Sequence, residues 1–543
     1  MKIKLRSYII GGMLAVLMTM SGVYITLRMN AFMWASILTA LMAISIYKIL
    51  KLEKDASVHE INIAQTAAST GGILAAGICF TIPAIHFLDQ ELFDSLTSDP
   101  KSFILKTFVL AFVGGIFGVL FSAYLRKNMI IEEKLPFAIG EATADTIRAG
   151  EKEGGRKIKI LLSAFGLSAI FTALRDGVSL SIGKIHFALE SVIPVFKRFQ
   201  SGAFKFEVPF MPMAIGAGYL IGYRIVSIWF LGCLFSYYVF QPFIHYFYDV
   251  PMAQMTEYVL PLGVGAVIGG GIIIFILKVI PSSIKTFKAM ISAKVLKDEV
   301  NPRWIPVFAV LAVFIMTTIL DLTIAASILA IIGIWVMTAL AGRLTGEVSI
   351  DPMEVFAVLI VLFVKIAVSL STYESIFIAA IAAVSVGVAG DLLFDLKAGH
   401  MLGTSPKEQA KAQMLGVVIG SLVVGISLLA ILNAFDLGSS ELFALQAQSV
   451  AYMLGAIDLK IFLLGAVIGT AITLLGRSGM VFGVGIFIPL YLSVAFFIGG
   501  AVNYLNRKKT KDETERLIAS GLIGGEGVVG ALLAIIKMIP LLI

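Results

Sequence analysis

The stretch "ASGLIGGEGVVGALLAII" (519–536) has the length and composition of a membrane-crossing helix, but it contains one ionisable side chain, that of Glu526. All its other residues are small or apolar, and the nearest charged neighbours along the chain are Arg516 and Lys537. A carboxylate at mid-depth in a bilayer is unfavourable unless it is paired, protonated or in contact with water. The stretch therefore predicts a membrane helix that carries a functional acid.

The composition of the whole chain indicates the same environment. Hydrophobic residues make up 59% of the 543 residues and charged residues only 14%, whereas about 25% is usual in a soluble domain. The net charge of +7 does not indicate a nucleic-acid partner, because the basic residues lie in short loops between apolar runs. The composition predicts an all-α polytopic membrane protein whose main surroundings are lipid.

Apolar runs long enough to cross a bilayer recur along the entire chain. They fall near 7–27, 31–50, 62–88, 103–125, 158–180, 225–246, 256–281, 304–321, 323–341, 353–371, 376–396, 411–434, 459–476, 480–504 and 516–541. Two shorter runs, 207–222 and 441–457, are candidates for short or re-entrant helices, which require protein or water around them. At roughly 20 residues per span, the sequence predicts about 16 transmembrane helices.

The distribution of Lys and Arg predicts the orientation of the chain in the membrane. Basic loops near 48–54, 126–159, 278–303, 397–411 and 507–516 are expected on the cytoplasmic side, and the amino terminus with them. Loops without Lys or Arg, such as 89–100 and 245–258, are expected outside. A cytoplasmic-membrane location is the prediction.

Similar stretches recur in the two parts of the chain. Residues 144–166 resemble 394–420, residues 216–238 resemble 483–505, and residues 260–274 resemble 519–533, in the same order. These pairs predict two homologous transmembrane halves, 1–295 and 300–543. Internal repeats are common in secondary transporters, whose substrate sites lie at the interface between repeats.

The acids of "GDLLFDLKAG" (390–399) form a second candidate site. Asp391 and Asp395 are four residues apart and share a helix face, with Lys397 just beyond them. If both carboxylates are buried, their repulsion favours binding of a proton by one of them. The alternative is a solvated helix end, at which Lys397 pairs with one of the acids.

The same spacing of acids occurs in the first part of the chain. Glu141 and Asp145 in "GEATADTIRAG" (140–150) are again four residues apart, and Gln65 lies within the apolar run 62–88. We expect Glu141 and Gln65 to line the path of a transported molecule.

The sequence does not match the motifs of ATP-driven transport or of an intramembrane hydrolase. "GVSLSIGKI" (177–185) departs from the phosphate-binding G-x-x-x-x-G-K-[ST] pattern. "GRSG" (476–479) resembles the serine stretch of an intramembrane hydrolase, but no histidine follows Ser478 to act as a base. We therefore expect a protein that is not an enzyme, and an intramembrane hydrolase is only a remote alternative.

Five stretches together resemble the oligopeptide transporter (OPT) family, which includes yellow-stripe-like carriers of metal chelates. They are "EINIAQTAASTGGILAAGICFTIPAI" (60–85), "EEKLPFAIGEATADTIRAGEKEGG" (132–155), "GDLLFDLKAGHMLGTSPKEQAKAQMLG" (390–416), "GVGIFIPLYLSVAFFIGG" (483–500) and "ASGLIGGEGVVGALLA" (519–534). They run from near the first span to the last. A prokaryotic member of the family is expected.

The resemblance implies proton-coupled symport of short oligopeptides or peptide-like metal chelates. The positions that match the family are Gln65, Glu141, Asp391, Asp395, Lys397 and Glu526. It also implies protons and a small-molecule substrate as partners within the lipid bilayer, and the proton gradient as energy source without a cofactor or a bound metal. A homodimer is compatible with this expectation, and a passive channel or facilitator is the main alternative function.

Overall fold

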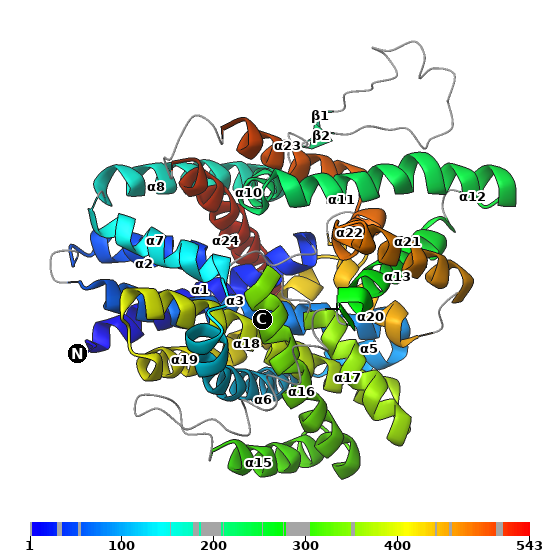
Figure 1. The fold of residues 1–543 in the computed structure, drawn as a ribbon, viewed down its shortest axis with the longest axis horizontal. Coiled ribbons are helices and arrows are strands. Elements are labelled where there is room, and N and C mark those ends of the chain that lie inside the picture. Colours follow the sequence, from blue (N-terminus) through cyan, green and yellow to red (C-terminus); the bar gives the residue numbers. More distant parts are fainter. Residues whose placement is uncertain are drawn as a thin grey trace. The chain divides into compact units, whose positions relative to one another are not determined.

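The computed structural model describes residues 3–29, 35–52, 56–152, 154–177, 184–185, 208–209, 211–251, 254–274, 276–277, 304–348, 353–439, 442–455, 459–506 and 514–542. These residues are almost entirely helical (Figure 1). The exception is a two-residue antiparallel pair, β1 (Lys184–Ile185) with β2 (Val208–Pro209). The protein is therefore an all-α polytopic membrane protein, as the composition predicts.

The chain divides into two compact units. Unit 1 comprises residues 1–158, 279–454 and 531–543, and unit 2 comprises residues 159–278 and 455–530. Each unit thus combines segments from both predicted halves of the sequence. The division into homologous halves at 295–300 stays a prediction.

Unit 1 is built around one long buried helix. Its helices are α1 (Leu5–Met29), α2 (Ala35–Ile49), α3 (Val58–Thr81), α4 (Ala84–Leu88), α5 (Gln90–Ser98), α6 (Pro100–Arg126), α7 (Ala138–Lys152), α15 (Trp304–Thr318), α16 (Ile324–Val348), α17 (Met353–Ala367), α18 (Thr372–Leu402), α19 (Pro406–Ala434) and α20 (Leu445–Leu454), with a π-helical turn at Lys127–Glu132. Helix α18 contacts α3, α6, α7, α16 and α17.

The sequence of α18 explains its central position. Its first two-thirds consist mainly of Ala, Val, Ile and Gly on all faces, as expected of a helix enclosed by other helices. Ser371 and Glu374 form a capping box at its start, and Gly403, with φ of 78°, ends it in a left-handed turn.

Unit 2 contains the remaining helices. These are α10 (Pro212–Ile221), α11 (Tyr223–Phe235), α12 (Gln241–Tyr248), α13 (Thr256–Ile274), α21 (Leu459–Leu474), α22 (Gly479–Phe487) and α23 (Leu490–Asn506), with π-helical turns at Ala173–Gly177 and Ser236–Phe240. Helices α8 (Gly154–Thr172) and α24 (Thr514–Leu542) contribute most of their residues to the same unit.

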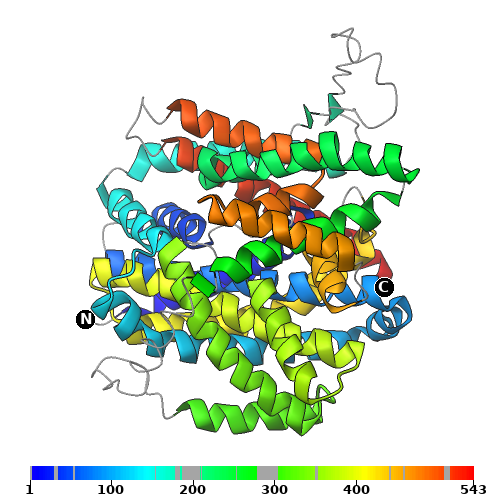
Figure 2. The same cartoon turned by 45° about the vertical axis from the view of Figure 1, so that its right-hand side comes forward.

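Glycines allow close helix contacts in unit 2. Helices α13 and α21 lie side by side (Figure 2), and a Cβ atom added at Gly269 would overlap the carbonyl of Ala466. The same holds for Gly469 against the carbonyl of Ala266. Helices in lipid associate mainly through close packing of small residues, so these glycines fix how near the two backbones approach.

The helices of unit 2 pair in mirrored chain order. Helix α8 contacts α24, α10 contacts α23, α11 contacts α22, and α13 contacts α21. Shared helix starts occur in unit 1: α3 and α18 both begin with Ser-x-x-Glu caps, and α6 and α19 both begin with a capping residue followed by Pro and Lys.

Among the described residues, seven helices are long and apolar enough to cross a membrane. They are Leu5–Arg28, Val58–Leu88, Pro100–Glu132, Tyr223–Tyr248, Ile324–Arg343, Thr372–Leu402 and Pro406–Ala434. The predicted run 480–504 is divided into α22 and α23, because Ile488 adopts an extended conformation before Pro489. The count of about 16 crossings, at roughly 20 residues each, stays a prediction.

Candidate functional site

Two buried carboxylates on α18 form the polar centre of unit 1. Asp391 is 5% exposed and Asp395 is fully buried. Helix α3 runs antiparallel to α18 beside the two acids. His59, near the start of α3, contacts Thr404 just after the end of α18, and Gly77, near the end of α3, packs against Val384 in the first half of α18. This register brings Ser69 between the two acids.

The Ser69 hydroxyl connects the carboxylates directly. Its oxygen lies 2.8 Å from Oδ2 of Asp391 and 3.0 Å from Oδ2 of Asp395. A hydroxyl has a single hydrogen to donate, so it cannot make two full hydrogen bonds to two ionised carboxylates. A proton on either acid would supply the missing hydrogen.

The other partners of this pair are neutral. The Gln65 amide donates to Oδ1 of Asp395 at 2.6 Å, and the Gln413 amide donates to Oδ2 of Asp391 at 3.2 Å. The Ser36 hydroxyl donates to Oδ1 of Asp391 at 3.3 Å. Within the described part of the chain, neither acid forms an ion pair with Lys, Arg or His.

This arrangement can bind and release a proton. Two negative charges held close together in a buried site repel each other, and the repulsion is relieved when one carboxylate is protonated. The four neutral donors keep the remaining charge hydrogen-bonded, which limits the free-energy cost of burying it. We refer to Asp391, Asp395, Ser69 and Gln65 as the carboxylate cluster.

Lys397 faces away from the carboxylate cluster. Its Nζ lies 3.2 Å from Oε1 of Glu141 and donates to the Leu135 carbonyl at 3.1 Å. The Lys397 side chain is 11% exposed and that of Glu141 is 46% exposed. The structure therefore joins two predicted residues, but not in the Lys–Asp pair considered from the sequence.

Asp145 lies at the surface of α7. Its side chain is 67% exposed and its Oδ1 lies 3.7 Å from Arg148, three residues further along the helix. The spacing of four residues from Glu141 therefore does not create a second pair of buried acids.

Glu526 is fully buried in unit 2 and forms an ion pair. Its Oε1 lies 2.9 Å from the Arg175 guanidinium, and its Oε2 accepts a hydrogen bond of 2.9 Å from the backbone N–H of Met213. Met213 lies in the first turn of α10, where backbone N–H groups lack partners within the helix and favour negative charge. In this structure Glu526 therefore has the partners of an ionised carboxylate.

Several residues of these sites are not evident from the sequence. Ser69 lies one turn beyond Gln65, a spacing that could have indicated a shared face once Gln65 was selected. Gln413 and Ser36 give no such signal, because their helices are distant in sequence. Arg175 is the only cation near Glu526 among the described residues, and its sequence position near the end of an apolar run equally suggests a loop charge.

No resident metal site is apparent in the residues that the structure describes. They contain no group of three or more His, Cys, Asp and Glu side chains close enough to hold a metal ion.

Buried, hydrogen-bonded acids in a polytopic helical membrane protein are typical of substrate pathways and proton relays, and so indicate the class of membrane transport proteins. Comparison with known families agrees with this class. The chain matches the family described as OPT oligopeptide transporter protein over residues 2–537. It belongs to this family, whose members are transporters and not enzymes.

Three relatives illustrate the similarity. A protein of Haemophilus influenzae whose name describes an oligopeptide transporter is 24% identical, covering 94% of this chain and 92% of that protein. The protein YGL114W of Saccharomyces cerevisiae, whose name also describes an oligopeptide transporter, is 22% identical, covering 87% of this chain and 86% of that protein. The iron-phytosiderophore transporter yellow stripe 1 of Zea mays is 23% identical, covering 78% and 72%.

Proposed function

We propose that this protein is a proton-coupled symporter of short oligopeptides or peptide-like metal chelates across the cytoplasmic membrane. The carboxylate cluster carries the proposal. A proton-driven carrier needs a buried group that binds a proton in one state and releases it in another, and Asp391 and Asp395 form such a group with Ser69 between them.

The substrate class follows from the family. The relatives' names include oligopeptide transporters and an iron-phytosiderophore transporter. Short peptides and amino-acid-derived chelators share amino and carboxylate groups, which charged side chains recognise. The half-exposed Glu141 with its Lys397 partner is a suitable first contact for such groups.

Proton binding would be coupled to helix movement through α3. When the pair Asp391–Asp395 gains a proton, its charge decreases and the hydrogen bond from Gln65 loses part of its strength, while Ser69 can accept the hydrogen that its second contact lacks. These residues link α18 to α3. A change in this link shifts the equilibrium between inward- and outward-facing arrangements, to the extent that protonation favours one of them.

Glu526 has a different role in the proposal. Protonation of Glu526 would leave the Arg175 charge buried without its partner, which is strongly unfavourable. We assign the first proton to the carboxylate cluster. The ion pair of Glu526 with Arg175 would hold the end of α8 and the start of α10 against α24. Glu526 and Arg175 would separate and bind other groups only during transport.

The remaining features complete the proposal. The proton gradient supplies the energy, and no resident cofactor takes part. The amino terminus is placed in the cytoplasm on the distribution of Lys and Arg. Association into a homodimer stays a prediction.

Uptake into proteoliposomes tests this function. We expect accumulation of labelled di- to hexapeptides, or of iron, nickel or copper chelates, when the outside is acidic, and its loss on adding a protonophore. Asp391→Asn and Asp395→Asn should each reduce gradient-driven uptake by about tenfold or more, because each removes a charge-assisted interaction of the cluster.

Asp436→Asn is the matched control, because Asp436 is an exposed acid at the end of α19. It should transport normally. Downhill flux that is insensitive to the protonophore, and equal in all three variants, would instead identify a passive facilitator.

A further inference from the structure

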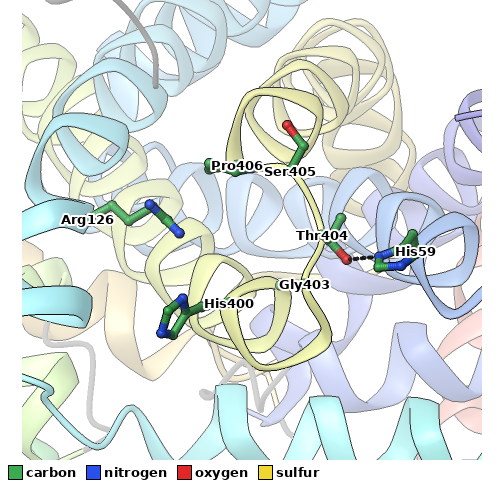
Figure 3. Close-up of a pocket in the computed structure, with 8 residues that line it drawn as sticks. His59, Arg126, His400, Gly403, Thr404, Ser405 and Pro406 are labelled. Atoms are coloured by element: carbon green, nitrogen blue, oxygen red, sulfur yellow. Dashed lines mark hydrogen bonds between the residues drawn. The ribbon is translucent and has the colours of Figure 1, made fainter. Parts of the chain in front are cut away.

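A polar pocket lies in unit 1 where α3 begins, α18 ends and α19 begins (Figure 3). Its volume is about 340 Å³, which leaves room for several water molecules at roughly 30 Å³ each. His400, Gly403 and Ser405 at its rim are exposed, whereas Gly399 and Thr404 in its wall are buried. The pocket therefore opens at the surface and ends against the buried part of α18.

The buried end of the pocket is one helical turn from the carboxylate cluster. Gly399 in the pocket wall follows Asp395 by four residues on α18. Four residues of an α-helix advance about 6 Å along its axis. Two consecutive hydrogen bonds between water molecules, at roughly 2.8 Å each, span this distance.

Three helices carry polar positions or acids along the route from the pocket to the acids. The series are Gly399, Asp395 and Asp391 on α18, Ser405, Gln409 and Gln413 on α19 and its cap, and His59, Asn62, Gln65 and Ser69 on α3. Positions three or four apart share a helix face. Each series begins with a residue that lines the pocket and ends at an acid or at a residue hydrogen-bonded to one.

Gln409 is in contact with both ends of this route. Its Nε2 donates to the backbone carbonyl of Asp395 at 2.6 Å. A Cβ atom added at Gly399 would overlap Oε1 of Gln409, so this oxygen lies directly against the pocket wall. Gln409 is fully buried, and its Oε1 accepts no hydrogen bond from the described residues.

Asn62 supplies a second such oxygen on α3. Its Nδ2 donates to Oε1 of Gln65 at 3.0 Å, and Gln65 in turn donates to Asp395. Asn62 is fully buried, and within the described part of the chain its Oδ1 has no donor. At the pocket end of the same face, His59 is hydrogen-bonded to Thr404 at 3.0 Å, as Figure 3 shows. Buried acceptors of this kind are commonly satisfied by internal water.

We propose that water bound to Gln409 and Asn62 connects the carboxylate cluster with the pocket, and that the transported proton leaves the cluster by this route. The inference rests on the proposed proton symport. The pair Asp391–Asp395 transfers one proton to the adjacent water, each water passes one on, and water in the pocket gains one. Neutral amides hold and orient the water but keep their own hydrogens. The pocket lies beside the basic loop 397–411, so the proton is released on the side predicted to be cytoplasmic.

Leucine substitutions test the passage, because leucine has a similar volume to asparagine and glutamine but cannot bind water. In proteoliposomes, Gln409→Leu and Asn62→Leu should each reduce accumulation driven by a pH gradient by about tenfold or more, because they interrupt proton transfer. The probe is a labelled peptide or iron chelate that the wild type takes up. Counterflow, the exchange of labelled for unlabelled probe at equal pH, should remain close to the wild-type rate, since exchange does not require release of the proton.

Asn433→Leu is the matched control. Asn433 is an exposed asparagine near the other end of α19, where its amide donates to the Leu429 carbonyl. This variant should accumulate and exchange the probe as the wild type does. Retained counterflow in Gln409→Leu or Asn62→Leu also shows that the variant is folded.

The passage is overturned if both leucine variants accumulate the probe normally. It is also overturned if both lose counterflow as severely as accumulation, because the two amides would then have only a structural role. A wild type that exchanges the probe but does not accumulate it on a pH gradient would overturn symport itself, and the passage with it. The two failures are distinguishable, because the first leaves accumulation by the wild type intact.

Discussion

The side-chain amide of Gln65 donates a 2.6 Å hydrogen bond to Asp395, a residue 330 positions further along the chain. Both side chains are fully buried, so this bond is shielded from water. It directly connects helix α3 to the carboxylate cluster on α18, and it is the contact through which we expect a change in protonation to reach α3.

Replacement of Gln65 tests this connection. Gln65→Ala should reduce gradient-driven uptake by about tenfold, because a hydrogen bond to a charged group contributes roughly 1.5–3 kcal/mol. Proteoliposome uptake at a fixed pH gradient measures the loss. Gln448→Ala, at a half-buried glutamine that bonds only the Phe443 carbonyl in the described residues, is the control. Equal uptake by both variants would contradict the proposed link.

Ser69 should be needed for stability as well as transport. Ser69→Ala removes the hydroxyl shared by the two carboxylates and should lower the free energy of unfolding by about 1–3 kcal/mol. The midpoint of thermal unfolding in detergent measures this effect. Ser98→Ala is the control, because the Ser98 hydroxyl is exposed and bonds only the Ser95 carbonyl. An unchanged midpoint in Ser69→Ala would exclude a structural link between the acids.

The pair Arg175–Glu526 allows a double-mutant cycle. Breaking a buried ion pair from one side costs about 3–5 kcal/mol, because the other charge is left buried. Arg175→Met and Glu526→Gln should therefore each destabilise the protein strongly, and the double variant should be more stable than the sum of the two losses predicts. Chemical or thermal unfolding of the four proteins gives the coupling energy.

The exposed pair Lys411–Glu408 provides a comparison for that cycle. Its side chains are 57% and 26% exposed, and exposed pairs contribute about 1 kcal/mol or less. If the two cycles gave the same coupling energy, the Arg175–Glu526 contact would not be a buried pair in the membrane.

Helix packing in unit 2 makes a prediction about two nearby glycines. Gly269→Ala should destabilise the protein by roughly 1–3 kcal/mol, because its new methyl group would overlap the Ala466 carbonyl. Gly271→Ala should be tolerated, since its Cβ would lie 3.7 Å from the Met480 sulfur, an ordinary contact. Thermal unfolding of the two variants measures the difference. Similar midpoints would show that α13 and α21 do not approach as closely as described.

The sequence predicts the helical class well because partition into lipid is a local property. Each apolar run reports its own transfer free energy, whatever it later contacts. Except at 480–504, the predicted runs lie on helices where the structure describes them. At 480–504 Pro489 interrupts an otherwise continuous apolar run. The same local reasoning selects Glu526 as a buried acid, because lipid makes an isolated charge unfavourable. For Asp391 and Asp395 it gives two alternatives, a buried proton site or a solvated helix end.

The partners of these acids could not be predicted from the sequence. Lys397 is two residues from Asp395 in sequence, yet it pairs with Glu141, which lies on α7. Helical geometry explains this difference, since residues two apart point to different faces. Asp145 has the same spacing from Glu141 as Asp395 has from Asp391, but its helix leaves it in solvent.

The sequence by itself determined that most of this chain lies in lipid, where its helices are, and which acids need an explanation. Only the tertiary structure decided that Ser69 connects Asp391 with Asp395 and that Arg175 neutralises Glu526. The physical reason is the distance along the chain over which each property is decided. Burial in a membrane depends on about 20 neighbouring residues, whereas a hydrogen bond or an ion pair depends on ångström-scale distances between helices far apart in the chain.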